Sequence, residues 1–176
     1  MNLDRKYLAL MGAADPEQAD ELRICFELLS LASAIDRDCA RRLAPHQLSE
    51  SRFLLLSLLR SDPDGLAPHL LAARAGVTRA TMTGLLDGMA KDGLLDRSHD
   101  SADRRRIIIR LTPEGRGLAD QLCDEHQGWI ASLAGGLSTA DRTALRQLLG
   151  RIRQNLGADA QTIPPQKDDG NDALSC

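Results

Sequence analysis

Three consecutive arginines, Arg104 to Arg106, stand before a short run of isoleucines in HDSADRRRIIIRLTPEG, residues 99–115. A group of guanidinium ions at this spacing can bind phosphate or carboxylate groups. The whole chain has 22 lysines and arginines against 25 aspartates and glutamates, yet the segment from Leu66 to Arg116 holds nine basic and six acidic side chains. A net charge of +3 in an otherwise negative protein favours a phosphate-binding surface in this segment.

The other reactive side chains do not form a recognisable catalytic or metal-binding set. The sequence contains no G-x-S-x-G, P-loop or H-E-x-x-H motif. The four histidines are scattered along the chain, at His46, His69, His99 and His126. The four cysteines have no C-x-x-C spacing and are Cys25, Cys39, Cys123 and Cys176. We therefore expect no enzyme, no metal, no cofactor and no disulfide framework.

Length and composition limit the kind of protein that carries these arginines. A chain of 176 residues, 43% of them apolar, can bury one core but is short for two domains. Aromatic residues make up 2% of the chain, which leaves little surface for stacking single-stranded bases. No segment has the apolar run of a signal peptide or the roughly 18 apolar residues of a membrane span. We expect one domain in a soluble, cytoplasmic protein without membrane association.

Four helices are predicted before the arginines. Apolar residues recur at three- and four-residue steps from Glu17 to about Arg42, which predicts a long amphipathic helix. Ser49 is placed to cap a second helix, SESRFLLLSLLR, which ends at the turn SDPDG. A short third helix, LAPHLLAARA, ends at Gly76, and Thr78 is placed to cap a fourth, TRATMTGLLDGMAKDG.

A β-hairpin is predicted next. LLDRS and RRIIIRLT are two short β-runs on either side of the polar tip HDSAD. In the second run Ile107, Ile109 and Leu111 alternate with Ile108 and Arg110, which predicts that the first set packs on the domain while Arg110 stays near solvent.

Two further helices complete the predicted order. Thr112 followed by Pro113 is typical of a helix start, and the long helix that follows ends at a pair of glycines. Ser138 and Asp141 resemble a capping box for a last helix, whose apolar stripe runs from Leu145 to Leu156.

The order helix, short helix, glycine turn, helix and hairpin is the layout of a winged helix-turn-helix. LLAARAGVTRATMTGLLDGMAKDGLLDR, followed by DSADRRRIIIRLTPEG, resembles the MarR family of bacterial transcriptional regulators, and the resemblance covers residues 20–156. The expected fold class is mainly α, with a small β-hairpin as the wing. The resemblance implies a winged DNA-binding part at 48–112 and dimerisation helices at 20–47 and 113–156, which leaves an N-terminal extension at 1–19. The polar composition of residues 157–176 predicts a disordered tail.

Two places are expected to contact double-stranded DNA. The fourth helix would meet base edges and phosphates near its N-terminal end. Its candidate residues are Thr78, Arg79, Ala80, Thr81 and Thr83. The candidates at the wing are Arg97, Asp103, Arg104, Arg105 and Arg106.

The wing candidates divide by charge. Arginines can enter a narrow minor groove, where negative potential is concentrated. Asp103 cannot contact phosphate favourably, so we expect it to pair with a nearby arginine and hold the tip in shape. The alternative is that the three arginines are only a solvated strand end.

The terminal helices need a partner for their apolar stripes. A homodimer would cover the stripes and present two recognition helices to a pseudo-palindromic duplex, with half-sites about one helical turn apart. The MarR resemblance implies the same arrangement. The expected function is that of a sequence-specific transcriptional regulator, and a repressor is favoured.

The resemblance also implies a trigger that releases DNA. MarR-like proteins commonly respond to a small, often aromatic and anionic, compound in the cleft between the dimer helices and the winged part. His46 and Arg52 are the candidates for binding its carboxylate, against the alternative of a solvated histidine and an exposed arginine. A rival trigger is oxidation of Cys25, because RICFELL resembles the segment with the reactive cysteine in the organic-peroxide-sensing branch. Tyr7 is the only tyrosine, so a buried, unreactive Cys25 is favoured over a redox site.

Overall fold

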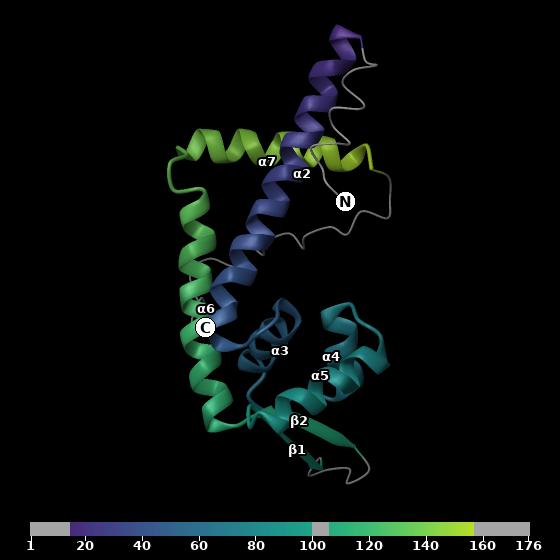
Figure 1. Ribbon diagram of the computed structural model, residues 1–176, viewed down its shortest axis with the longest axis vertical. Coiled ribbons are helices and arrows are strands. Elements are labelled where there is room, and N and C mark those ends of the chain that lie inside the picture. The colour runs from purple at the N-terminus through teal and green to yellow at the C-terminus, as the bar shows by residue number, and fades with distance from the viewer. Residues whose placement is uncertain (1–14, 100–105, 157–176) are drawn as a thin grey trace.

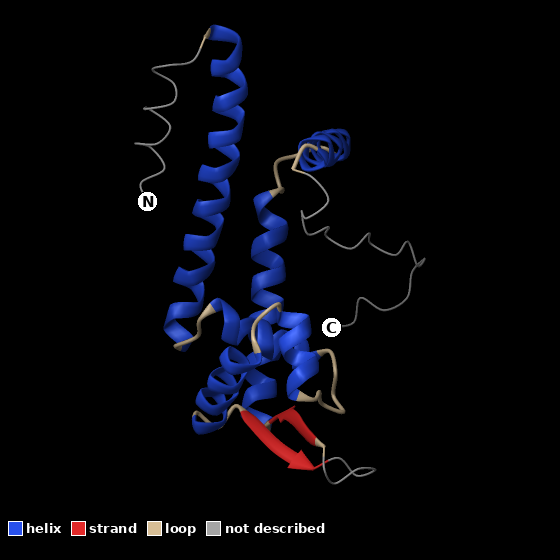
Figure 2. Ribbon diagram, turned by 90° about the vertical axis from the view of Figure 1, so that its right-hand side faces the viewer, coloured by secondary structure: helices blue, strands red, loops and turns tan. Residues whose placement is uncertain are grey.

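The structure, a computed structural model, describes residues 15–99 and 106–156 and has two parts of different shape (Figure 1). Two long helices, α2 (Pro16–Leu43) and α6 (Pro113–Leu133), extend from a compact lobe. The last helix, α7 (Thr139–Gln154), runs crosswise to α6 at its far end (Figure 2). Within the described residues no helix is both long and apolar enough to cross a membrane. The predicted fold class, mainly α with one hairpin, is confirmed.

Helix caps set the order of the lobe. Ser49 Oγ accepts a hydrogen bond from the backbone N–H of Arg52 (3.3 Å), and Thr78 Oγ1 accepts one from Thr81 N–H (3.1 Å), so both predicted caps are confirmed. Gly76 has φ +65°, the left-handed region that favours glycine, and makes the tight turn between the two helices of the helix-turn-helix. The elements are η1 (Ala44–His46), α3 (Glu50–Arg60), α4 (Pro68–Ala75), α5 (Arg79–Lys91), β1 (Leu95–His99) and β2 (Ile107–Leu111).

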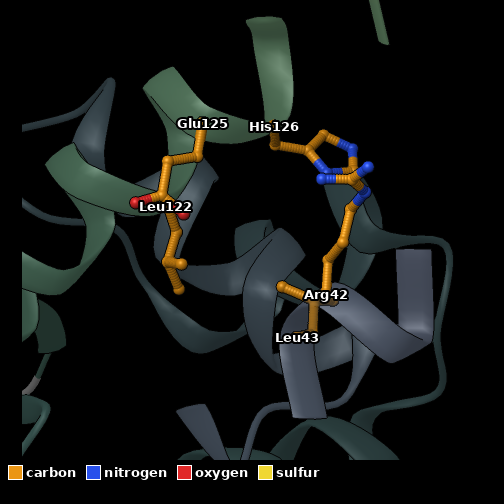
Figure 3. A pocket seen from close by; sticks show the side chains of 5 residues that line it. All are labelled: Arg42, Leu43, Leu122, Glu125 and His126. Atoms are coloured by element: carbon orange, nitrogen blue, oxygen red, sulfur yellow. The ribbon is translucent and has the colours of Figure 1, made fainter. Parts of the chain in front are cut away.

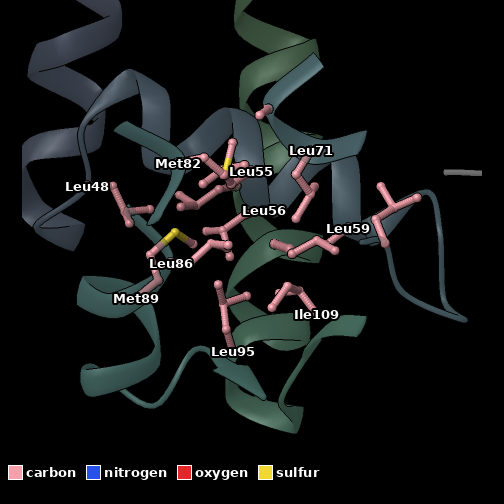
Figure 4. Close-up of a cluster of buried hydrophobic side chains, with 14 of the residues drawn as sticks. Leu48, Leu55, Leu56, Leu59, Leu71, Met82, Leu86, Met89, Leu95 and Ile109 are labelled. Carbon is pink, nitrogen blue, oxygen red and sulfur yellow. The ribbon is translucent and has the colours of Figure 1, made fainter. Parts of the chain in front are cut away.

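Helix α3 lies at the centre of the lobe core (Figure 4). Leu55, Leu56 and Leu59 of α3 are at most 1% exposed. They pack with buried side chains of α4, α5 and β2, which include Leu71, Met82, Met89 and Ile109. Because α3 also contacts α2 and α6, it is the element through which the long helices are joined to the helix-turn-helix.

The hairpin joins β1 and β2 in antiparallel register, from Leu95 opposite Leu111 to His99 opposite Ile107. The prediction that Ile107 packs on the domain is wrong, since its side chain is 45% exposed, and Ile108 is buried instead. The reason is that Ile107 lies at the outer end of the hairpin, whereas Ile108 packs against Gly65, where no Cβ intervenes. Ile109 is buried as predicted and exchanges backbone hydrogen bonds with Leu66 (2.9 and 3.0 Å).

The start of α6 is fixed closely to the end of α5. Thr112 Oγ1 accepts a hydrogen bond from Gly115 N–H (3.0 Å) and donates one to the carbonyl of Gly93 (2.7 Å). A Cβ on Gly115 would lie 2.0 Å from the carbonyl oxygen of Leu94, so only glycine allows this approach. The wing and the long helix therefore meet at a tightly packed junction.

The long helices and α7 carry apolar side chains on their outer surfaces. The capping box of α7 is confirmed, because Ser138 Oγ accepts from Asp141 N–H (3.2 Å) and Asp141 Oδ2 accepts from Ser138 N–H (3.0 Å). No residue of α7 is buried. The exposed large apolar residues of α2, α6 and α7 are Ile24, Leu29, Leu31, Ile130, Leu133, Leu145, Leu148 and Ile152, and Leu156 is exposed just after α7.

Two predicted boundaries can be compared with the structure. Helix α2 begins at Pro16, inside the expected N-terminal extension 1–19. The expected disordered tail, 157–176, lies outside the described residues.

Candidate nucleic-acid interface

The N-terminal end of α5 presents small polar side chains and one arginine to solvent. Thr78, Arg79, Ala80, Thr81 and Thr83 are all exposed, as the sequence predicts. The Thr78 and Thr81 hydroxyls hydrogen-bond to each other (2.9 Å), and the Thr83 hydroxyl donates to the carbonyl of Arg79 (3.0 Å). Each hydroxyl keeps an acceptor site for an outside donor. This end of α5 is therefore a surface that can be approached closely and offers hydrogen bonds.

Arg79 is free to bind an outside group, because no described residue forms a hydrogen bond or ion pair with its guanidinium. It borders a surface hollow of about 380 Å³ together with Thr83 of α5 and His69 of α4. His69 is a candidate that the sequence analysis did not identify. Its position next to Pro68, the first residue of α4, was the available signal, since the first turn of this helix faces the start of α5.

Only part of the wing can be placed. Arg106 is exposed at the start of β2, beside the hairpin end. Asp103, Arg104 and Arg105 lie outside the described residues, so their proposed contacts stay predictions. Arg97 forms an ion pair with Asp87, so its guanidinium already links β1 to α5. A DNA contact by Arg97 also stays a prediction.

Ion pairs join both ends of α3 to neighbouring helices. At the N-terminal end, Arg52 pairs with Asp92 at the end of α5 and donates a hydrogen bond to the carbonyl of Gln47 (3.3 Å). At the C-terminal end, Arg60 pairs through Nε with Asp120 (2.7 Å) and through Nη2 with Asp124 (3.1 Å) of α6. The hydrogen bond to Asp120 is the largest of the interactions that raise the pKa of Arg60 above its usual range.

Arg52 donates a hydrogen bond to the carbonyl of Gln47, the residue after His46, so the two predicted effector residues lie near each other, and effector binding by either stays a prediction. Arg52 is engaged by Asp92, and His46 lies in η1, half-buried. A cleft of about 210 Å³ lies instead between the end of α2 and the middle of α6, lined by Arg42, Leu43, Leu122, Glu125 and His126 (Figure 3).

His126, which lines the cleft, belongs to a group of tilted aromatic rings that the sequence analysis missed. The His126 ring lies between Phe53 and Trp129, with centroid distances of 4.8 and 4.9 Å. The Arg42 guanidinium lies 4.9 Å from the centroid of the Trp129 ring, at cation–π distance. Burial, together with the positive charge of Arg42, lowers the pKa of His126. The spacing of Cys123, His126 and Trp129 at three-residue steps was the signal for one helix face.

The prediction that Cys25 is buried is wrong for this chain, since Cys25 is exposed on α2. Cys39 is partly buried. Its burial is the main cause that raises the pKa of its thiol, and the nearby carboxylates raise it further. Cys123 is the buried thiol of the described residues, at 7% exposure. Cys25, the thiol that the family resemblance singled out, is therefore open to solvent, whereas Cys123 is buried.

The assembly of exposed recognition helix, hairpin and long flanking helices can be compared with known proteins. Residues 48–107 match the sequence model of the MarR family. Over 139 residues the chain is 34% identical to the HTH-type transcriptional repressor YetL of Bacillus subtilis, across 78% of this chain and 83% of YetL. The chain belongs to the MarR family. This MarR protein is accordingly a DNA-binding transcriptional regulator and not an enzyme.

Solved structures of MarR-like fold include two studied with small molecules. CouR from Rhodococcus jostii RHA1, bound to p-coumaroyl-CoA, is 26% identical, with a TM-score of 0.61 over 73% of this chain and 90% of CouR. Bordetella bronchiseptica BpsR, whose DNA binding is regulated by 6-hydroxynicotinic acid, is 28% identical, with a TM-score of 0.56 over 72% of this chain and 90% of BpsR.

Proposed function

We propose that this MarR protein is a homodimeric repressor that binds a pseudo-palindromic DNA operator and is released from it by a small aromatic, anionic effector. The observation that carries the proposal is the exposed start of α5, where the Arg79 guanidinium has no partner among the described residues and three threonines are also exposed. A recognition helix meets base edges with these first residues. Arg79 is the candidate for bidentate binding of guanine, and the threonines for phosphates and base edges.

The outer surfaces of the terminal helices support a dimer. Apolar side chains such as Leu145 and Leu148 on α7 are 43% and 51% exposed, and α7 buries no residue within one chain. A helix of this length gains most of its stability from packing an apolar face against another element. A second copy of the same chain, with its own α2, α6 and α7, supplies such a face and closes the assembly by two-fold symmetry.

The cleft between α2 and α6 is the proposed effector site. Arg42, whose Nε is paired with Asp38 (3.0 Å), is the cation that borders the cleft and could meet a carboxylate, and His126 is the ring that lines it. The aromatic compounds named for CouR and BpsR agree with this choice of ligand. Arg42 and Arg52 are both paired with an aspartate, so the choice of this cleft over His46 and Arg52 is supported by the hollow between α2 and α6 and by the His126 ring that lines it.

The proposal is tested by selecting duplexes from a random pool and measuring affinity for the enriched sequence and a scrambled one. We expect an inverted repeat to be enriched. Arg79→Ala should narrow the affinity gap between the two duplexes by about 1 to 3 kcal/mol if a bidentate base contact is lost. The matched control is Arg74→Ala, because Arg74 of α4 is already paired with Asp62. A pool without an inverted repeat, or equal effects of the two variants, would contradict the proposal.

A redox sensor that uses Cys25 is the second candidate, and the exposure of this thiol favours it. The test is release of the selected duplex by an organic hydroperoxide. Release from the parent protein but not from Cys25→Ser would support the redox sensor. Equal release from both, or none, would remove it and leave ligand binding as the trigger.

A further inference from the structure

The surface hollow beside Arg79 has a second side chain that can carry a positive charge, His69, to which the proposed function gives no role. Helices α4 and α5 lie side by side, and the hollow, of about 380 Å³, is lined by the first residues of α4 and the first two turns of α5 (Figure 1). His69 and Arg79 are both exposed. A group that approaches from solvent can therefore reach both side chains.

Neither side chain is engaged within the described part of the chain. No described residue forms a hydrogen bond or ion pair with the His69 ring or with the Arg79 guanidinium. The other residues that line the hollow are Pro68, Met82 and Thr83, so no acidic side chain is among the described lining residues. The hollow therefore has one fixed positive charge, and a second one when the imidazole is protonated.

The surroundings of the His69 ring have one sign of charge. Helix α4 packs against α3, α5 and β2, and Arg79 is the charged side chain that these elements contribute to the lining. On α4 itself, Arg74 lies in the last turn and is paired with Asp62. No described carboxylate thus borders the hollow to neutralise a protonated imidazole.

A DNA phosphate is the anion that suits this position. In a helix-turn-helix the second helix enters the major groove while the first crosses the sugar–phosphate backbone. Helix α4 is the first of the pair and α5 the second, so a hollow between their starts lies where the backbone borders the groove. A phosphodiester has a full negative charge and two free oxygens, which can accept hydrogen bonds from two sides.

We propose that His69 binds a phosphate of the DNA strand whose base Arg79 reads, and that DNA binding is accompanied by proton uptake at the His69 ring. This inference rests on the proposed function. A protonated imidazole donates a charge-assisted hydrogen bond to phosphate, whereas the neutral ring donates a weaker one.

The proton and the DNA favour each other's binding. Without DNA, the positive charge of Arg79 opposes a second positive charge in the same hollow, and a bound phosphate offsets this repulsion. The coupling is reciprocal, so protonation raises the affinity for DNA by the same factor. Because histidine changes its charge between about pH 5 and pH 8, the gain in affinity is present at the acidic end of this range and is lost as the pH rises through it.

The test measures the affinity for the selected and the scrambled duplex at pH 6 and pH 8. The parent is compared with His69→Gln, which cannot be protonated, and with His69→Lys, which stays charged at both pH values. The ratio of the affinity at pH 6 to that at pH 8 should be at least about fivefold larger for the parent than for either variant, since hydrogen bonds of charged groups exceed neutral ones by roughly this factor. At pH 8, His69→Lys should bind at least about fivefold more tightly than His69→Gln. Both effects should be equal for the two duplexes, because a phosphate contact carries no sequence information.

Two results would overturn the role of His69. One is an equal pH ratio for the parent and His69→Gln, which would assign the proton to another group. The other is a His69→Lys variant that binds no more tightly than His69→Gln at pH 8. Circular dichroism at both pH values checks folding. If a variant does not fold, the parent alone decides, because its slope of log affinity against log salt should steepen by up to about 0.9 per subunit from pH 8 to pH 6, and an unchanged slope rejects the contact.

Failure of this inference can be told apart from failure of the proposed function. Tight, pH-insensitive binding of an enriched inverted repeat would reject the role of His69 and leave the repressor proposal standing. A random pool that yields no inverted repeat would reject the operator proposal, and the pH comparison would still be made on the scrambled duplex, since a phosphate is present in any sequence.

Discussion

Replacing Gly115 by alanine tests whether the junction between wing and long helix is as tight as its geometry indicates. The new Cβ would lie 2.0 Å from the carbonyl oxygen of Leu94, whereas real Cβ contacts below 3.0 Å essentially do not occur, so the two backbones must separate by about 1 Å. That carbonyl accepts the hydrogen bond of Thr112 N–H (3.1 Å), which the movement strains. Neither partner is a flexible side-chain end that can turn aside.

The expected loss follows from three contributions. Overpacking costs about 1 to 3 kcal/mol. A strained or lost hydrogen bond costs about 0.5 to 1.5 kcal/mol. Alanine returns about 1 kcal/mol because it favours the helix over glycine. The net loss of unfolding free energy is about 0.5 to 3.5 kcal/mol, or roughly 1 to 14 °C in Tm for a chain of this size.

Gly117→Ala is the matched control, two residues further along α6. Nothing lies within 4 Å of a Cβ at Gly117, so this variant should be more stable than the parent by up to about 1 kcal/mol. Urea unfolding followed by circular dichroism at equal protein concentration measures both variants. If Gly115→Ala proves as stable as Gly117→Ala, the account of the junction is refuted.

Three further perturbations act on other parts of the molecule. Arg106→Ala should weaken binding to the selected and the scrambled duplex equally and lower the salt slope by about one unit, unlike Arg79→Ala; unchanged affinity for both duplexes would remove Arg106 from the interface. Leu148→Glu should shift the sedimentation of the dimer toward monomer, while Gln147→Glu on the same helix should not; a Leu148→Glu dimer of parent affinity would exclude this stripe. The pKa of His126 is lowered in the folded chain, so the unfolded chain binds its proton first and stability should fall as the pH drops below about 6.5. His126→Gln should flatten that part of the stability–pH curve measured by urea unfolding; an unchanged curve would contradict the assignment.

The sequence predicted the elements well because their ends depend on local chemistry. Ser49, Thr78 and Ser138 cap helices through hydrogen bonds that span three residues, and such pairs are visible in a linear sequence. The exposed start of α5 followed from the same cap and from the period of its apolar residues.

Predictions that depended on distant neighbours were less accurate. The alternation rule placed Ile107 inward. Its actual position depends on where the lobe ends and on the space beside Gly65, and both are set by tertiary packing. The ion pair of Arg52 with Asp92, forty residues away, was not predicted.

The ion pairs at the two ends of α3 give ionic strength a second way to act on this protein. Arg52 and Arg60 are 21% and 9% exposed, but their partners are at least half exposed, so dissolved ions reach one member of every pair. Added salt weakens phosphate contacts and, through these pairs, also loosens the attachment of α3 to α5 and α6. The slope of DNA affinity against salt concentration therefore includes the weakening of these ion pairs as well as the loss of phosphate contacts. The number of phosphate contacts calculated from that slope is an upper limit.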